Sequence, residues 1–406
     1  MTVRARISDP GNWRNDKAIL VPEAHSVASL GVIRSLGRAG YRVHALGTHP
    51  DSIGFRSRYA VKSVLKPNYG ARGFGQWLMD YIRSESIAAI LPVGILEATR
   101  PRFAELAPLM PIARDEEKVF RALTKFGVFE DLLESDQPEL KANLPPTLLI
   151  DRERGLPSLG DVRALPPPYF IKVDSSLSTS RKPSAVVRAA DAPTALEHID
   201  RLSNDYSRFI VQGFVPGMGA AAAFVIWGGR VVADFMNVCN HETDGFCSLR
   251  QSWYHHRMRE DALAKIRHIG WEGISMLEYR WDPATDRFYF IELNPRFWAA
   301  LHVALYAGCD LPRYLFDAFF GDRNEIEQKY PLGVKSRLTF PFEIGYTLSQ
   351  LRRPDLAWTR KAREALTFLA LFADPRVKSD LFFPGDRALY LESIWRTAKQ
   401  VAQGRH

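Results

Sequence analysis

Residues 274–296, ISMLEYRWDPATDRFYFIELNPR, constrain the fold most, because two apolar stretches flank a turn rich in proline, aspartate and threonine. The alternation predicts an antiparallel hairpin, and it places Phe288 and Phe290 on the same face of the second strand as Glu292 and Asn294. A face that begins with two phenylalanines is expected to begin buried. A carboxylate beside buried aromatic rings needs a partner, so the hairpin is a candidate polar site.

The hairpin also predicts which residues face each other. A turn centred near Thr285 would place Glu278 directly across from Glu292, and Arg280 and Asn294 would lie on the same face. Two carboxylates about 5 Å apart repel by roughly 3 kcal/mol at an effective dielectric constant near 20, so they share a proton or are bridged by cations. Two carboxylates and an amide suit magnesium. The same spacing also fits an ordinary exposed hairpin face.

The amino-terminal stretch predicts an α/β domain. Residues 18–22 (AILVP) and 42–46 (RVHAL) are expected to be strands, joined by a helix that stops at Gly40. Residues 88–94 are expected to add a further strand to the same sheet. The turn after the first strand has no G-x-G-x-x-G, so a Rossmann-like domain without a dinucleotide site is predicted.

Three segments further along the chain have their own expected structure. Residues 114–127 predict one helix that ends at Gly127, and the last 80 residues predict a mainly helical region. Residues 365–373 (ALTFLALFA) form a nine-residue apolar run, whereas a membrane helix needs about 20 residues. We expect that run to be buried or to face a second copy in a dimer.

Charge and cysteine content limit the kinds of binding partner and the cellular compartment that we expect. The formal net charge of +8 favours anionic partners, but the basic residues are spread along the chain. A solvated basic surface is therefore favoured over nucleic-acid binding, and no membrane partner is expected. Three cysteines without a CxxC pair predict reduced thiols. The polar amino terminus has no apolar signal segment, so a cytoplasmic protein is expected.

The hairpin carries a resemblance to a known family. Residues 270–298 resemble the metal-binding hairpin of the ATP-grasp superfamily, most closely its biotin carboxylase and carbamoyl-phosphate synthetase type. The resemblance implies that Glu278, Glu292 and Asn294 hold two magnesium ions, or manganese ions, against the phosphates of ATP. Arg296 would bind the acyl phosphate or the substrate carboxylate during catalysis. A salt bridge from Arg296 to one of the acids is the alternative.

The same resemblance implies nucleotide-binding residues. Lys172, at the end of the strand YFIKV, would meet phosphate oxygens and take part in catalysis, and Lys118 would bind the nucleotide from a helix before the lid. Gln212, Phe214 and Val215 would lie at the adenine hinge. This chain departs from the family pattern by lacking an acid at position 212 and by lacking glycine in the loop 174–181. An ordinary exposed lysine remains the alternative for Lys118.

Between the hinge and the hairpin, residues 240–256 offer groups for an acceptor pocket: His241, Arg250, His255 and His256. Their spacing matches no zinc pattern, and a polar surface loop is the alternative. The chain has no G-x-S-x-G motif, which argues against hydrolase chemistry.

The resemblance implies an α/β and α+β architecture of three consecutive parts. These are a Rossmann-like pre-ATP-grasp domain (1–112), an ATP-grasp domain (113–325) with a lid (about 145–211) and a metal-binding core (about 212–325), and a helical region (326–406). It also implies a carboxylate–amine ligase that forms ADP and acts on small molecules. A homodimer is a separate expectation, which rests on the apolar run 365–373 and not on the resemblance. A catalytically weakened nucleotide-binding module is the alternative.

Overall fold

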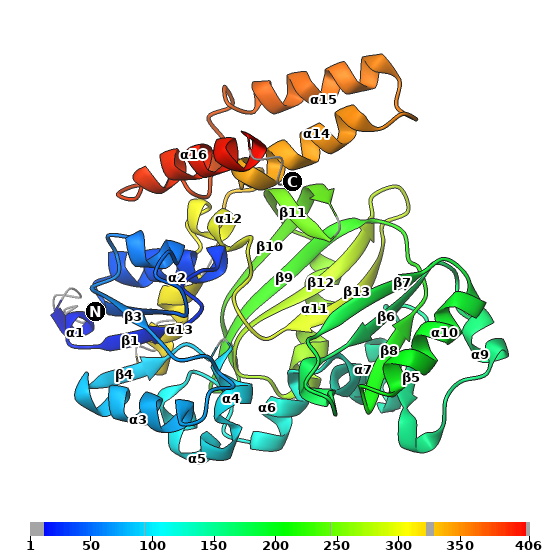
Figure 1. Ribbon diagram of the computed structural model, residues 1–406, viewed down its shortest axis with the longest axis horizontal. Helices are drawn as coiled ribbons and strands as arrows, with labels where there is room; N and C mark the ends of the chain where they lie inside the picture. Colours follow the sequence, from blue (N-terminus) through cyan, green and yellow to red (C-terminus); the bar gives the residue numbers. More distant parts are fainter. Residues whose placement is uncertain (1–11, 93, 244, 322–328, 403–406) are drawn as a thin grey trace, which may run out of the picture. The chain divides into compact units, whose positions relative to one another are not determined.

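The computed structural model describes residues 12–92, 94–243, 245–321 and 329–402 (Figure 1). The chain forms two compact units, each assembled from separate stretches of sequence. The first unit consists of residues Met1–Ile112, Val225–Trp253 and Arg296–His406. The second unit consists of residues Ala113–Phe224 and Tyr254–Pro295. The predicted division into three consecutive parts stays a prediction.

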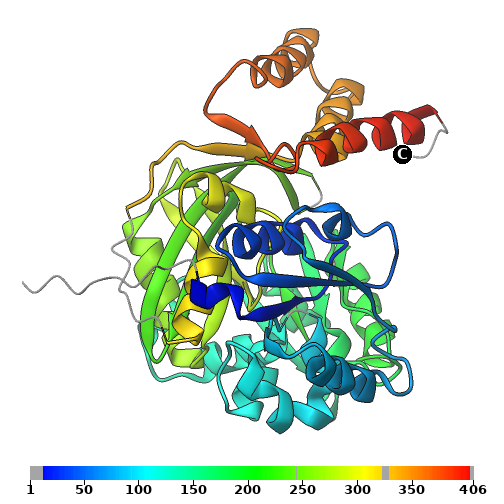
Figure 2. The same ribbon diagram turned by 90° about the vertical axis from the view of Figure 1, so that its left-hand side faces the viewer.

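A four-stranded parallel sheet of order β3-β2-β1-β4 begins the first unit (Figures 1 and 2). Its strands are β1 (Ala18–Val21), β2 (Arg42–Gly47), β3 (Lys62–Leu65) and β4 (Ile87–Ile90). Helix α2 (Val27–Arg38) links β1 to β2, and α3 (Phe74–Ser84) links β3 to β4. Every residue of β1 is buried, as expected for a parallel strand. The predicted Rossmann-like arrangement is confirmed.

Local sequence explains why α2 forms where it does. The hydroxyl of Ser26 accepts a hydrogen bond from the backbone N–H of Ser29 at 3.0 Å and caps the helix. Leu30, Ile33 and Leu36 recur at helical spacing and are fully buried. Gly40 follows the helix in the left-handed conformation (φ 95°), which suits a glycine stop. The short helices nearby are α1 (Asn12–Asn15), α4 (Ile95–Thr99) and α5 (Phe103–Leu106).

The rest of the first unit combines strands with the carboxy-terminal helices. Strands β10 (Arg230–Thr243) and β11 (Phe246–Trp253) are antiparallel, β14 (Lys335–Arg337) pairs with β11, and β15 (Val377–Ser379) pairs with β14. The helices are α12 (Leu301–Tyr306), α13 (Leu311–Phe319), α14 (Ile344–Arg352), α15 (Trp358–Ala370) and α16 (Ala388–Ala402). The predicted helical character of this carboxy-terminal region is confirmed. No helix in the described parts of the chain is long and apolar enough to cross a membrane.

The cysteines depart from expectation. Cys239 of β10 and Cys247 of β11 form a disulfide with their Cα atoms 5.7 Å apart, and Cys309 is free and buried. The prediction of three reduced thiols is therefore wrong for two of them. The lack of a CxxC pair does not exclude a disulfide, because the β10–β11 hairpin brings together cysteines eight positions apart.

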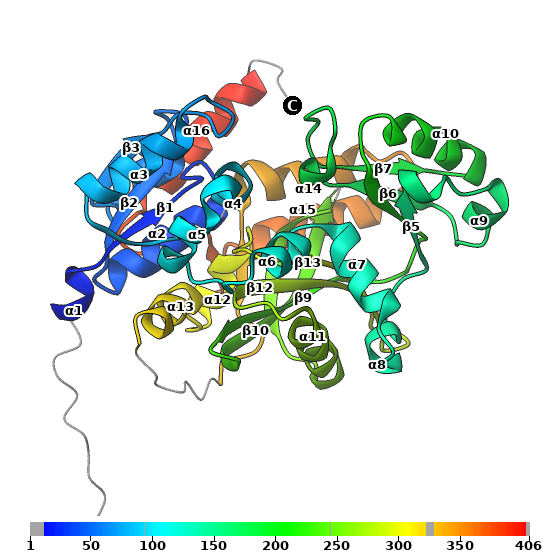
Figure 3. The same ribbon diagram turned by 90° about the horizontal axis from the view of Figure 1, so that it is seen from below.

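The second unit contains an antiparallel four-stranded sheet of order β5-β8-β6-β7 (Figure 3). Its strands are β5 (Thr147–Asp151), β6 (Tyr169–Val173), β7 (Ala185–Ala189) and β8 (Arg208–Gln212). Helices α9 (Leu159–Arg163) and α10 (Ala192–Ser203) contribute to the core of this sheet, where Ile171, Phe209 and Ile199 are fully buried. That core holds β6, and with it Lys172, in a defined position.

The second unit also contains the β12–β13 hairpin. Strand β12 (Gly273–Asp282) lies between β13 (Arg287–Asn294) and β9 (Met218–Trp227). The helices of this part are α6 (Glu116–Ala122), α7 (Lys125–Glu134), α8 (Pro138–Lys141) and α11 (His256–Ile269). Gly217 (φ 123°) precedes β9, and a Cβ atom there would come within 2.6 Å of the backbone of Trp281. Only glycine therefore permits this close approach to β12.

The prediction of a single helix over residues 114–127 is wrong, because the segment forms α6 and α7 with a break between them. Thr124 ends the break, and its hydroxyl accepts from the backbone N–H of Gly127 at 3.0 Å to cap α7. Gly127 therefore lies in the first turn of a new helix and does not end the previous one. A Cβ atom at Gly127 would come within 2.6 Å of the carbonyl oxygen of Arg121.

Candidate active site

The two glutamates of the hairpin face each other as predicted. Glu278 of β12 pairs with Glu292 of β13, and a β-bulge follows between Glu278 and Tyr279. Beyond the bulge Tyr279 pairs with Phe290, so Ile291 is the extra residue. The bulge therefore brings the two carboxylates together on one face.

The bulge also reverses one expectation. Phe290 pairs with Tyr279 and stacks on Phe129 of α7 at a ring-centroid distance of 5.5 Å. Directly opposed residues share a face, so Phe290 lies on the face of Tyr279 and not on the face of Glu278 and Glu292. The prediction that Phe288 and Phe290 share a face with Glu292 is wrong. The hairpin has one aromatic face for packing and one polar face for chemistry.

Asn294 completes the polar set at the end of β13. Its side-chain amide donates a hydrogen bond to Oε1 of Glu292 at 2.9 Å, and the residue is 8% exposed. The structure therefore brings Glu278, Glu292 and Asn294 together. Among the residues described, no group of three or more histidine, cysteine, aspartate or glutamate side chains could hold a metal ion. A site of two carboxylates and one amide matches magnesium, which takes few protein ligands.

Two lysines lie beside the acid pair. Lys172 of β6 is 6% exposed, and its Nζ donates to the carbonyl oxygen of the bulge residue Ile291 at 3.5 Å. Lys125, the first residue of α7, has its Nζ 3.7 Å from Oε2 of Glu292 and 3.1 Å from Oδ1 of Asp174. The backbone N–H of Lys125 also donates to Asp174 at 2.7 Å. Three elements of the second unit thus converge on one cluster of opposite charges.

The pKa values of the two glutamates are shifted in opposite directions. Burial raises the pKa of Glu278 to about 8, and the charge of Glu292 adds to the rise. Burial also acts to raise the pKa of Glu292, but the charges of Lys125 and Lys172 outweigh it and lower that pKa. Burial lowers the pKa of Lys172, against the opposing charge of Glu292. At neutral pH the opposite shifts favour a proton on Glu278 and a negative charge on Glu292.

The roles expected for Lys118 and Arg296 stay predictions. Lys118 of α6 has a side chain that is 62% exposed, with its Nζ 3.9 Å from Asp115. Lys125, seven residues further on, lies beside Glu292 and was not predicted from the sequence. The signal in the sequence is Thr124, a residue that can cap a helix beginning at Lys125. The sequence prediction placed both residues inside one helix. Arg296 belongs to the first unit, so its proposed role stays a prediction.

One backbone N–H of the predicted adenine hinge is already hydrogen-bonded within the protein. Gln212 is 3% exposed and donates to the hydroxyl of Thr147 at 3.4 Å. The backbone N–H of Phe214 donates to the carbonyl oxygen of Pro166 at 2.8 Å. That N–H therefore already has an acceptor within the protein, while the ring of Phe214 is 45% exposed. The adenine contacts of Gln212, Phe214 and Val215 stay predictions.

The glycine-poor loop 174–181 is anchored by side chains and by a neighbouring turn. Asp174 accepts from Lys125, and Ser184 accepts from the backbone N–H of Ser175 at 2.8 Å. Further along, the backbone N–H of Thr179 donates to Asp205 at 2.8 Å. Side-chain and backbone hydrogen bonds thus order a loop that contains no glycine.

The four candidate acceptor residues are divided between the two units, with His241 and Arg250 in the first and His255 and His256 in the second. Arg250 is fully buried and pairs with Asp380 at 2.5 Å. His241 stacks on Tyr346 with ring centroids 4.6 Å apart. His255 caps α11 and lies 2.8 Å from Asp286. His256 begins α11. The acceptor pocket expected from these four residues stays a prediction.

A comparison with protein families finds one match. Residues 248–311 match the family model described as carbamoyl-phosphate synthase L chain, ATP binding domain. The match includes the whole β12–β13 hairpin but less than half of the chain. No curated protein sequence matches this chain.

Solved structures resemble a larger part of the chain at low sequence identity. The biotin carboxylase domain dimer of Hydrogenobacter thermophilus 2-oxoglutarate carboxylase is 14% identical, with a TM-score of 0.59 over 79% of this chain and 73% of that chain. Biotin carboxylase from Campylobacter jejuni is 15% identical, with a TM-score of 0.59 over 79% and 74%. The L-amino acid ligase of Bacillus licheniformis is 14% identical, with a TM-score of 0.54 over 75% and 74%.

Proposed function

Because this chain has the ATP-grasp fold, we propose that it is an ATP-dependent carboxylate–amine ligase. The reaction would activate a carboxylate as an acyl phosphate, join it to an amine, and release ADP and phosphate. The observation that carries the proposal is the facing pair Glu278 and Glu292 beside the buried Lys172. An acid pair flanked by lysines is suited to a metal–nucleotide complex.

Each member of the cluster has a role in the proposal. Glu278, Glu292 and Asn294 would hold magnesium, which would neutralise charge on the phosphate oxygens. Glu278 must release its proton for this, because a carboxylate binds metal in its ionised form. Lys172 and Lys125 would donate to phosphate oxygens, and Asp174 holds Lys125 in place for that contact.

The proposed chemistry needs no protein nucleophile. The substrate carboxylate would attack the terminal phosphate of ATP, and the amine would then attack the acyl phosphate. Arg296 is proposed to bind the substrate carboxylate or the acyl phosphate. Part of the barrier would be removed by holding both reactants in a shared orientation, which is a general advantage of binding two substrates in one site.

The substrate class is open to a direct search. The solved structures include an L-amino acid ligase and a carboxylase domain in complex with bicarbonate. We therefore propose amino acids and small carboxylic acids as the first acids to test. ADP release, measured with pairs of acids and amines, should appear only with magnesium and the correct pair. Glu292→Gln should not release ADP with that pair.

A weakened nucleotide-binding module is the second candidate. The observation that favours it is the Phe214 N–H, which already donates to Pro166. Such a module would bind ATP without substrate-dependent ADP release. Magnesium-dependent ADP formation that requires both an acid and an amine would exclude it.

A further inference from the structure

Helix α15 presents an exposed apolar face. Trp358 is 78% exposed, Leu366 66% and Leu369 61%, and Phe372, just after the helix, is 52% exposed. At about 100° per residue, these four side chains fall within roughly 120° of one another around the helix. We call them the α15 face. This side of the helix is therefore not buried within the chain, and the alternative expectation, contact with a second copy, stays a prediction.

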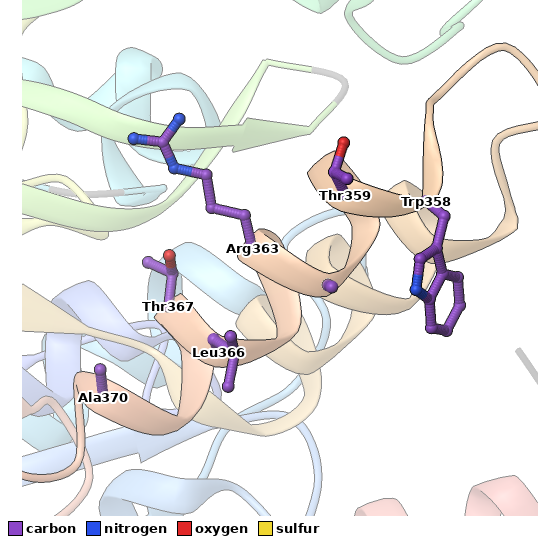
Figure 4. Close-up of a pocket in the computed structure, with 7 residues that line it drawn as sticks. Trp358, Thr359, Arg363, Leu366, Thr367 and Ala370 are labelled. Carbon is purple, nitrogen blue, oxygen red and sulfur yellow. The ribbon is translucent and has the colours of Figure 1, made fainter.

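A shallow hollow of about 510 Å³ lies along the helix. Figure 4 shows that Trp358, Leu366 and Ala370 contribute to its lining together with Arg363. All the residues that line the hollow belong to α15 itself. An exposed apolar surface with basic side chains at its edge is typical of a docking site.

The inner side of α15 is attached to the rest of the first unit. Leu371 is 8% exposed, and the guanidinium of Arg337 donates a hydrogen bond to the carbonyl oxygen of Phe368 at 3.4 Å. Helix α14 packs against α15. The helix is therefore held by one side and presents the other to solvent. An exposed Trp and two Leu side chains cost free energy in water, so a covering surface would stabilise them.

The charge around the face is positive. The stretch 352–364 contains five basic residues, and Asp355 and Glu364 are its two acids. Arg353 forms an ion pair with Asp355 at 2.5 Å. Of the remaining basic residues, Arg352 ends α14, and Arg360, Lys361 and Arg363 lie in α15. Lys361 and Arg363 are expected on opposite edges of the α15 face by helical spacing.

We propose that the α15 face docks on an anionic phospholipid surface. An amphipathic helix with tryptophan and leucine on one face and basic residues beside them matches the pattern of helices that lie in the membrane interface. Tryptophan also favours the headgroup region of a bilayer. The binding would be peripheral, and it revises the expectation that the chain has no membrane partner.

A second copy of the chain is the less suitable occupant. Two copies would bring like charges together, whereas an anionic surface attracts them. A helix of this length is about 20 Å long and about 10 Å wide, so its face covers on the order of 200 Å². A stable dimer buries about 800 Å² on each partner. Shallow insertion of one helix into a bilayer has no such requirement.

Sedimentation of the full chain with phospholipid vesicles tests the proposal. The chain should bind vesicles that contain phosphatidylglycerol, bind weakly to pure phosphatidylcholine, and be released by high salt. Leu366→Ser combined with Leu369→Ser should lower the partition coefficient roughly tenfold or more. Leu332→Ser is the matched control, because Leu332 is 62% exposed outside α15. That control should bind like the parent.

A charge variant gives a second arm that leaves the apolar side chains in place. Lys361→Glu combined with Arg363→Glu should weaken binding to the anionic vesicles while the circular dichroism spectrum stays unchanged. The proposal is overturned if the parent ignores anionic vesicles, or if the leucine variant binds as well as the parent. It is also overturned if the parent is a dimer in solution that Leu366→Ser with Leu369→Ser separates, because the face then belongs to a second copy.

Discussion

Glu278 and Glu292 face each other across the β12–β13 hairpin, with a β-bulge immediately after Glu278 that sets the pairing. Without the bulge, the register of the pair Tyr279–Phe290 would continue to Glu278 and Ile291, and Glu292 would not face Glu278. The bulge carbonyl also accepts from Lys172 at 3.5 Å. One local irregularity therefore aligns the acid pair and supplies an acceptor for the buried lysine.

Glu292→Gln should abolish magnesium-dependent ATP turnover. The substitution removes the charge of one proposed metal ligand but changes little volume, so the melting temperature should stay close to that of the parent. Glu139→Gln, at an exposed position of α8, is the control and should keep full activity. Turnover of Glu292→Gln equal to that of the parent would remove the metal site from the account.

Lys172→Met should weaken ATP binding. A charge-assisted hydrogen bond contributes about 1.5–3 kcal/mol, which corresponds to roughly a 10- to 150-fold loss of affinity. Titration calorimetry with ATP and magnesium measures it, and Lys141→Met on the exposed side of α8 is the control. Equal affinities of parent and Lys172→Met would assign Lys172 to a structural ion pair.

Variants of Lys125 and Lys118 show which of the two lysines binds the nucleotide. Lys125 lies 3.7 Å from Glu292, whereas the side chain of Lys118 is 62% exposed. Lys125→Met should therefore weaken ATP binding about as much as Lys172→Met does, and Lys118→Met should change it little. Nucleotide titrations of both variants give the answer. The reverse order would restore Lys118 as the nucleotide ligand.

The pKa of Glu278 predicts how the stability of the metal-free protein depends on pH. Burial and the charge of Glu292 raise this pKa from near 4.5 to about 8, so the folded protein binds more protons than the unfolded chain between those values. The contribution of Glu278 to the free energy of unfolding is therefore full below about 4.5 and is lost as the pH rises to about 8. Glu278→Gln should flatten this part of the pH dependence.

Urea denaturation in the presence of a chelator measures that dependence at several pH values. Glu139→Gln should keep the slope of the parent, because Glu139 is exposed. If Glu278→Gln and the parent have the same slope between about pH 5 and about pH 8, Glu278 does not hold the proton.

Thiol titration tests the disulfide. The denatured, unreduced protein should have one reactive thiol, that of Cys309, and reduction should expose the two further thiols of Cys239 and Cys247. Three reactive thiols before reduction would restore the expectation from the sequence.

The sequence was sufficient for the parts of the fold that depend on local pattern. The buried run of β1, the capped helix α2 and the turn of the β12–β13 hairpin all follow from periodicity and turn residues. The facing of Glu278 and Glu292 was predicted from a turn centred near Thr285. In the structure the β12–β13 ladder continues to the pair Asp282 and Arg287, so the turn is centred slightly before Thr285. The extra residue at the bulge offsets this shift, and Glu278 therefore still faces Glu292.

The parts that could not be predicted depend on contacts between distant segments. Lys125 reaches Glu292 only because α7 begins at Thr124, and the break between α6 and α7 has no strong signal in a pattern of helix-forming residues. The disulfide depends on the register of β10 and β11. The exposure of Leu366 and Leu369 depends on which side of α15 is attached. None of these follows from the spacing of residues along the chain.

The fate of the carboxylate oxygen tests the central claim most directly. An acyl phosphate transfers one oxygen of the substrate carboxylate to the phosphate that is released. Once ADP release identifies the substrate, the acid can be labelled with heavy oxygen and the released phosphate analysed by mass spectrometry. We expect one labelled oxygen in inorganic phosphate, formed together with ADP. Unlabelled phosphate, with all the label left in the amide and the unreacted acid, would contradict the account, and so would AMP and pyrophosphate as products.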